Sequence, residues 1–243
     1  SHYGINIDGS WIDIEKLTYL TGEEIEIRNK LKQALEKEKI GGLTDTQALK
    51  RYINHVGFTY LNRFAALRAM EVRNLIIETI IPRQYYGGKS LREMQLIERS
   101  TNIDPKDTLK LSLNESFKEV SKEIGVLFDI NDPYCLVFPD KRACLEIINF
   151  LSFDVNENDW KQDDIIGWIY QYFNEETRNS LRKSDKKSSA EDIPITSQFY
   201  TPDWIVKAIV DNTLEHYWFS MHPTSSLIHC KYHIQRERIK IPK

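Results

Sequence analysis

A long helical repeat of apolar residues constrains the fold of this chain more than any other feature. Apolar side chains recur at intervals of three and four between residues 49 and 70, at Leu49, Ile53, Val56, Tyr60, Phe64, Leu67 and Met70. Thr44 and Gln47 stand just before this run with the spacing of a capping box, a common helix start. The pattern predicts one amphipathic helix that ends near residue 72.

Further helical patterns lie on both sides of this segment. Thr21 and Glu24 repeat the capping-box spacing, and apolar periodicity predicts helices at 109–127 and 163–173. Residues 74–81 are rich in Ile and fit either a short strand or a turn of buried helix. Since no long strand-like alternation occurs, we expect a mainly α, bundle-like fold with few or no short strands.

Composition excludes several classes of protein. Apolar residues make up 41% of the 243 residues, which is enough for a core, and no apolar run approaches the length of a membrane helix. A net charge of −3 is unlike the basic surplus of proteins that wrap nucleic acid. Three cysteines without regular spacing argue against a disulfide framework and fit a reducing cytoplasm. We therefore expect a cytoplasmic protein without membrane contact.

A change in composition divides the chain. Residues 183–192 are rich in Lys, Ser and Asp, which indicates a flexible link between a helical domain at 1–182 and a second part at 193–243. In that second part Thr201 precedes Pro202, an order that predicts a helix with Thr201 as N-cap and Pro202 in the first turn. The predicted helix ends near residue 220. Its expected buried stripe comprises Ile205, Ala208, Ile209 and Thr213.

Three segments carry a family likeness. They are residues 58–71 (FTYLNRFAALRAME), 164–176 (DIIGWIYQYFNEE) and 193–206 (IPITSQFYTPDWIV). In this order and at this spacing they resemble the PglX methyltransferases of BREX phage-defence systems, and the likeness runs from about residue 45 to the end. The resemblance implies the helical amino-terminal module of an adenine-specific DNA methyltransferase that uses S-adenosylmethionine. It also implies double-stranded DNA and other defence-system subunits as partners of the full-length protein.

Within the third segment, residues 198–202 look like motif X of amino-methyltransferases, which lies beside the cofactor. The resemblance makes Phe199, Tyr200, Thr201 and Pro202 the candidate cofactor-binding residues. At a helix start, the Thr201 hydroxyl and nearby amides would suit the carboxylate of S-adenosylmethionine, because helix starts favour anions. The alternative is that Thr201 only caps its helix and that Phe199 belongs to the core.

The catalytic motifs of the family are not expected in this chain. It contains no Gly-x-Gly, so the Gly-rich loop of motif I is absent. Residues 131–134 (NDPY) invite comparison with motif IV, but they lack its second Pro and precede the motif X-like segment, so a turn is the better interpretation. We therefore expect no catalytic residue here and weak or no cofactor binding by the isolated chain.

Other residues admit a functional and a structural interpretation. In the functional interpretation Arg63 or Arg68 contacts a phosphate, but a salt bridge of Arg68 with Glu71 is the preferred interpretation. A cluster of His and Cys lacks the closed four-ligand set of a zinc site, so no metal is expected. Lysines of the link would contact DNA or simply be solvated. The cluster and the lysines are His222, His229, Cys230 and His233, and Lys183, Lys186 and Lys187.

Two other functions compete with the methyltransferase module. One is a helical scaffold that binds DNA or other subunits of the defence complex. The other is a nuclease, which needs an acidic metal site with a nearby Lys. Residues 36–39 (EKEK) contain acidic residues next to Lys. We interpret them as a solvated charge run on a helix, which disfavours a nuclease.

Overall fold

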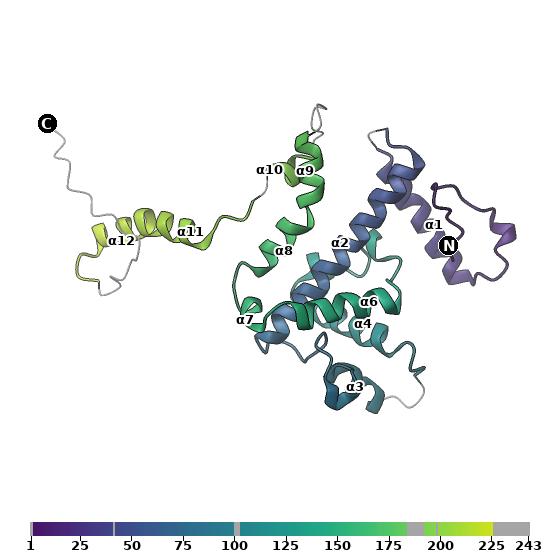
Figure 1. Cartoon of the computed structure of the whole chain (residues 1–243), viewed down its shortest axis with the longest axis horizontal. Coiled ribbons are helices and arrows are strands. Elements are labelled where there is room, and N and C mark those ends of the chain that lie inside the picture. Colours follow the sequence, from purple (N-terminus) through teal and green to yellow (C-terminus); the bar gives the residue numbers. More distant parts are fainter. Residues whose placement is uncertain (1, 41, 100–102, 184–191, 198, 226–243) are drawn as a thin grey trace. The chain divides into compact units, whose positions relative to one another are not determined.

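A computed structural model describes residues 2–40, 42–99, 103–183, 192–197 and 199–225. Over these residues the regular structure is helical, apart from two isolated antiparallel bridges, Ile5 with Trp11 and Arg83 with Lys89. The predicted mainly α fold is confirmed (Figure 1). The α-helices are α1 (Gly22–Glu38), α2 (Asp45–Val72), α3 (Leu91–Arg99), α4 (Thr108–Val120), α5 (Gly125–Phe128), α6 (Lys141–Asn149), α7 (Glu157–Trp160), α8 (Ile165–Phe173), α9 (Glu175–Lys183), α10 (Asp192–Ser197), α11 (Asp203–Val210) and α12 (His216–Met221).

Shorter helical pieces connect these helices. The 3₁₀ turns are Ile14–Lys16, Gln84–Tyr86 and Pro133–Cys135, and the π-helical turns are Phe150–Asp154 and Asp211–Glu215. No described helix is long and apolar enough to cross a membrane.

The chain divides into two compact units, Ser1–Ile166 and Gly167–Lys243, with the boundary inside α8. This division differs from the predicted one, which placed a link at 183–192. Most of that link lies outside the described residues, so the link stays a prediction.

Helix α2 is the central element of the first unit and contacts α1, α5, α6 and α7 (Figure 1). Its predicted start is confirmed, because the Thr44 side chain accepts from the Gln47 amide and the Gln47 side chain accepts from the Thr44 amide. The predicted face was wrong at Ile53, which is 58% exposed. Tyr52 is buried instead and packs with Leu31 of α1, because α1 approaches α2 on that side.

The second half of α2 is buried on most sides by aromatic packing. Phe64 stacks on Phe117 of α4, and Phe117 contacts Phe128 of α5. The prediction of a single helix over 109–127 was wrong, since α4 ends at Val120 and the chain turns before α5. The turn allows Phe128, which is fully buried, to enter the core, and the burial of an aromatic ring outweighs a few helical hydrogen bonds.

Helix α2 ends in a Schellman motif. Asn74 adopts a φ of 57°, the Leu75 amide donates to the Met70 carbonyl and the Asn74 amide donates to the Glu71 carbonyl. The segment 74–81 that follows is neither strand nor helix. Its amides at Thr79 and Ile80 donate to the buried carboxylate of Glu71, so a side chain of α2 replaces the backbone partners that a strand or helix would provide.

The second unit contains most of α8, together with α9 and α10, and a longer helical stretch from α11 through the π-helical turn to α12. The predicted helices at 163–173 and to about residue 220 are confirmed. The predicted buried stripe on the latter was wrong, because Ile209 is 57% exposed. Trp168 and Tyr172 of α8 are also exposed. Apolar periodicity finds such a face but does not show whether another element covers it.

Candidate functional site

The motif X-like segment begins with an aromatic side chain held by two arginines of α9. The guanidinium carbon of Arg178 lies 4.8 Å from the centre of the Phe199 ring, and that of Arg182 lies 5.6 Å from it. Phe199 remains 50% exposed. Its interpretation as a core residue was therefore wrong. It packs on α9 by one side only, with cation–π attraction in place of full burial.

The next residue, Tyr200, lies against α8. A Cβ atom at Gly167 would stand 2.1 Å from Tyr200 Cδ1, so the ring occupies space that only a glycine leaves open. Tyr200 is 49% exposed. Two consecutive aromatic residues are thus each supported by a different helix, and each keeps about half of its surface free.

Thr201 and Pro202 complete the segment. The prediction of Thr201 as the N-cap was wrong. Pro202 is the N-cap of α11, and no side chain caps this helix. The ψ angle of Pro202 is 140°, and the Pro202 carbonyl accepts the first helical bonds from the Ile205 and Val206 amides. Thr201 therefore precedes the cap, and its hydroxyl is not used for capping.

The segment borders an open depression of about 570 Å³. It is lined by Tyr170, Ser197, Phe199, Tyr200 and Thr201. Aromatic surface and hydroxyl groups thus meet beside the start of α11, where the first amides have no earlier helical carbonyl to bind. Asp203 would oppose an anion there, but it forms an ion pair with Lys207 at 2.5 Å. The depression suits a ligand with a flat ring and a carboxylate.

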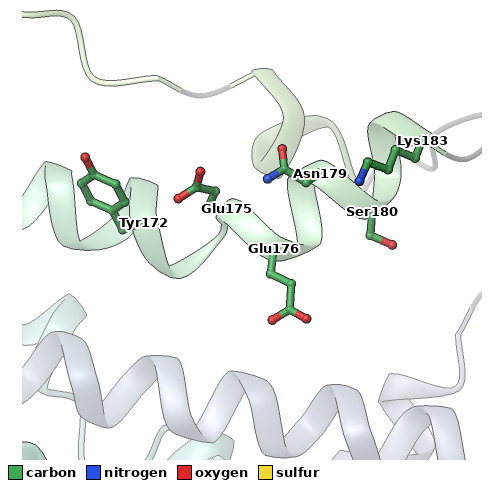
Figure 2. A pocket seen from close by; sticks show the side chains of 6 residues that line it. All are labelled: Tyr172, Glu175, Glu176, Asn179, Ser180 and Lys183. Atoms are coloured by element: carbon green, nitrogen blue, oxygen red, sulfur yellow. The ribbon is translucent and has the colours of Figure 1, made fainter.

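A second depression of about 640 Å³ lies along the surface of α8 and α9 (Figure 2). It is lined by Tyr172, Glu175, Glu176, Asn179, Ser180 and Lys183. Figure 2 shows Glu176 and Ser180 on the same side of α9. The charged groups on this surface are the carboxylates of Glu175 and Glu176 and the ammonium of Lys183, so it is not built for an anion. No group of three metal-ligating side chains occurs among the described residues.

Residues 131–134 form a capped turn, as preferred from the sequence. Asp132 Oδ1 accepts from the Tyr134 amide, and the Pro133 carbonyl accepts from the Tyr52 hydroxyl. These contacts fasten the turn to α2. The Asp132 carboxylate and the Pro133 carbonyl thus have partners within the turn and on α2.

Arg63 and Arg68 of α2 have structural partners as well. Arg63 donates to the carbonyls of Leu127 and Asp129, and Arg68 donates to Glu71 at 2.6 Å. The predicted pairing of Arg68 and Glu71 is confirmed, although the pair lies in the core and not on the helix surface. Buried and paired in this way, neither arginine is available to a phosphate.

The charge run at 36–39 is only partly solvated, contrary to the interpretation above. Glu38 is 6% exposed, forms an ion pair with Arg51 at 2.9 Å and accepts from the Tyr134 hydroxyl at 2.7 Å. This carboxylate joins α1, α2 and the turn at Tyr134. The candidate metal cluster falls largely outside the described residues, as do Lys186 and Lys187, so both interpretations remain predictions.

Gly167 and Arg178 were not among the residues selected from the sequence. A glycine inside an apolar helix often marks a close approach of another group, and this signal could have identified Gly167. No sequence pattern identified Arg178, because its partners come from other elements.

The sequence of the chain is similar to those of known methyltransferases. The chain is 29% identical over 232 residues to the adenine-specific methyltransferase PglX of Lacticaseibacillus casei (strain Zhang), covering 82% of the chain and 19% of that protein. It is 27% identical over 218 residues to the adenine-specific methyltransferase BrxX of Escherichia coli O9:H4 (strain HS), covering 79% of the chain and 17% of that protein. The chain is homologous to these methyltransferases.

The predicted resemblance to PglX is thereby confirmed. No family model matches the chain. The chain spans less than a fifth of the length of these PglX and BrxX relatives. The similarity therefore does not assign the activity of a whole methyltransferase to this chain.

Proposed function

We propose that this chain is the helical module of a BREX adenine-specific DNA methyltransferase and that residues 199–202 form part of its S-adenosylmethionine site. The likeness to PglX and BrxX supports the family, and the motif X-like sequence supports the place of the site. One observation carries the cofactor role. Phe199, Tyr200 and Thr201 line one open depression directly before a helix start.

The chemistry explains why such a module would need the rest of a methyltransferase. Methyl transfer to the exocyclic amine of adenine requires a bound cofactor, a base taken out of the duplex stack and polar groups that orient the amine. In this proposal the aromatic rings of Phe199 and Tyr200 support the cofactor, and Thr201 with the first amides of α11 faces its carboxylate. A Gly-rich loop and the amine clamp come from other sequence, so the isolated chain is inactive and binds the cofactor weakly.

The same proposal names the partners. The full-length protein acts in the cytoplasm on double-stranded DNA, in contact with other subunits of the defence system. The net charge of −3 disfavours extensive DNA binding by this chain, so in this proposal the DNA contact is local or comes from other parts of that protein.

Titration calorimetry with S-adenosylmethionine tests the cofactor role. We expect a longer form that includes a Gly-rich motif I loop to bind, and this chain alone to bind much more weakly. Thr201→Ala should weaken binding by the longer form, whereas Thr213→Ala should not. Thr213 is the matched control because it is an exposed threonine of the same helical stretch and its hydroxyl donates only to the Ile209 carbonyl. No binding by the longer form, or no effect of Thr201→Ala, would remove the cofactor role.

A scaffold module is the second candidate function. The observation that favours it is the apolar surface of the stretch from α11 through the π-helical turn to α12, where Trp204, Leu214 and Tyr217 are each more than half exposed (58%, 67% and 64%). A scaffold would form a stable complex with defence-system subunits without added cofactor or DNA. Co-purification of this chain with those subunits, compared with a Trp204→Ser and Leu214→Ser variant, separates the two functions.

A further inference from the structure

Arg178 ties together three parts of the second unit. The residue is 5% exposed. Its Nε donates to the Ile195 carbonyl of α10 at 3.0 Å, and its Nη2 donates to the Gln171 carbonyl of α8 at 3.3 Å. Both carbonyls lie in the last turn of their helices, where unsatisfied carbonyls favour a cation. The same guanidinium then faces the Phe199 ring.

Gly167 provides a second and independent contact. The Tyr200 ring lies so close to the α8 backbone that a Cβ atom at Gly167 would stand within 2.4 Å of three ring atoms. Glycine weakens a helix relative to alanine, and the close approach of Tyr200 explains why the first turn of α8 contains one. Thus α9 fixes Phe199 and α8 fixes Tyr200, immediately before Thr201.

We propose that Arg178 and Gly167 are positioning residues that hold the Phe199–Thr201 segment in the geometry needed to bind S-adenosylmethionine. This inference rests on the function proposed above. The two residues touch the segment from the side of α8 and α9, so they act on the cofactor only through Phe199 and Tyr200. The half-exposed rings are consistent with this role, because the contacts fix one side of each ring and leave the other side available.

The test uses four single variants in this chain and in the longer form that carries the motif I loop. Gly167→Ala introduces the clash with Tyr200. Arg178→Lys keeps the charge but loses the planar group that donates to two carbonyls and stacks on a ring. The matched controls are Gly57→Ala, at an exposed helical glycine with no atom within 4 Å of an added Cβ, and Arg142→Lys, at an arginine that is 88% exposed.

Two readouts separate the inference from the proposed function. Hydrogen–deuterium exchange of residues 199–206 reports the anchoring and needs no ligand. We expect exchange about tenfold faster in Gly167→Ala and Arg178→Lys than in either control. Calorimetry on the longer form reports the cofactor, and we expect affinity about tenfold weaker in the same two variants.

A double-mutant cycle excludes general destabilisation as the cause. With Tyr200→Ala already in place, Gly167→Ala should have no further effect on the affinity, since the ring it would strike is gone. An equal effect in both backgrounds overturns the positioning role of Gly167.

Other outcomes are equally decisive. Unchanged exchange in Gly167→Ala and Arg178→Lys overturns the anchoring. Faster exchange with an unchanged affinity overturns the positioning role while the proposed function stands. If the wild-type longer form binds no S-adenosylmethionine, the proposed function fails and the cofactor role inferred here fails with it, whatever the exchange shows.

Discussion

Arg68 Nη1 donates to Glu71 Oε1 at 2.6 Å inside the first unit, where both side chains are at most 4% exposed. Glu71 also accepts from the amides of Thr79 and Ile80 through Oε2. One carboxylate therefore neutralises a buried arginine and fixes the loop that leaves α2. Because the pair lies one turn from the helix end, it joins the helix and the loop into one structure.

Glu71→Ala should destabilise the protein by about 3–5 kcal/mol, since it leaves Arg68 buried without a counter-charge and removes the acceptor of three amides, those of residues 79–81. The control is Glu146→Ala, which breaks the exposed pair with Arg142 and should cost at most about 1 kcal/mol. Urea unfolding followed by circular dichroism measures both changes. Equal losses in the two variants would show that the buried carboxylate has no special role.

Thr44 and Thr201, which both precede helices, should differ in their effect on stability. Thr44 accepts from the Gln47 amide in a capping box, so Thr44→Ala should cost about 1 kcal/mol. Thr201 makes no capping bond to α11, so Thr201→Ala should leave the unfolding midpoint unchanged. Thermal unfolding of both variants checks this expectation. A comparable loss in Thr201→Ala would mean that Thr201 caps the helix after all.

Burial raises the pKa of the Cys135 and Cys144 thiols to about 11 from the ordinary 9.0. An unfolded chain would release these protons near pH 9.0, whereas the folded chain retains them. Their contribution to stability is therefore full below pH 9.0 and declines as the pH rises toward 11. The urea midpoint should fall between pH 8 and 10, and Cys144→Ala should reduce that fall.

Alkylation gives a second measurement of the same property. The thiolate is the reactive form, so iodoacetamide should modify Cys135 and Cys144 in the folded chain at pH 8 much more slowly than after unfolding in urea. Equal rates in the two states, mapped by mass spectrometry at each cysteine, would contradict the burial of these thiols.

Local chemistry determined much of the fold. The capping boxes at Thr21 and Thr44 involve residues three apart in the chain, and the structure forms both. The apolar period that predicted α2 is a property of the helix itself. The turn at Asp132 likewise depends on its own side chain and the next amides. Such features can be predicted from the sequence because all partners are neighbours along the chain.

Contacts between distant residues were decided by the tertiary structure alone. The sequence indicated an amphipathic face on α2. Only the packing of α1 decided that Tyr52 is covered and that Ile53 stays exposed. It placed Glu38 in a solvated run, and the structure buries Glu38 against Arg51 and Tyr134. Those partners are far apart in the chain, so the apolar periodicity of a helix cannot predict their contacts.

The candidate site divides in the same way. The resemblance to the PglX family selected Phe199, Tyr200, Thr201 and Pro202, and nothing in their composition showed what holds them. Only the folded chain brings Arg178 to Phe199 and Gly167 to Tyr200. The sequence by itself thus determined the helices and the residues of interest, because both depend on short-range pattern. The tertiary structure decided which side chains are buried and which support the site, because burial depends on what packs from elsewhere.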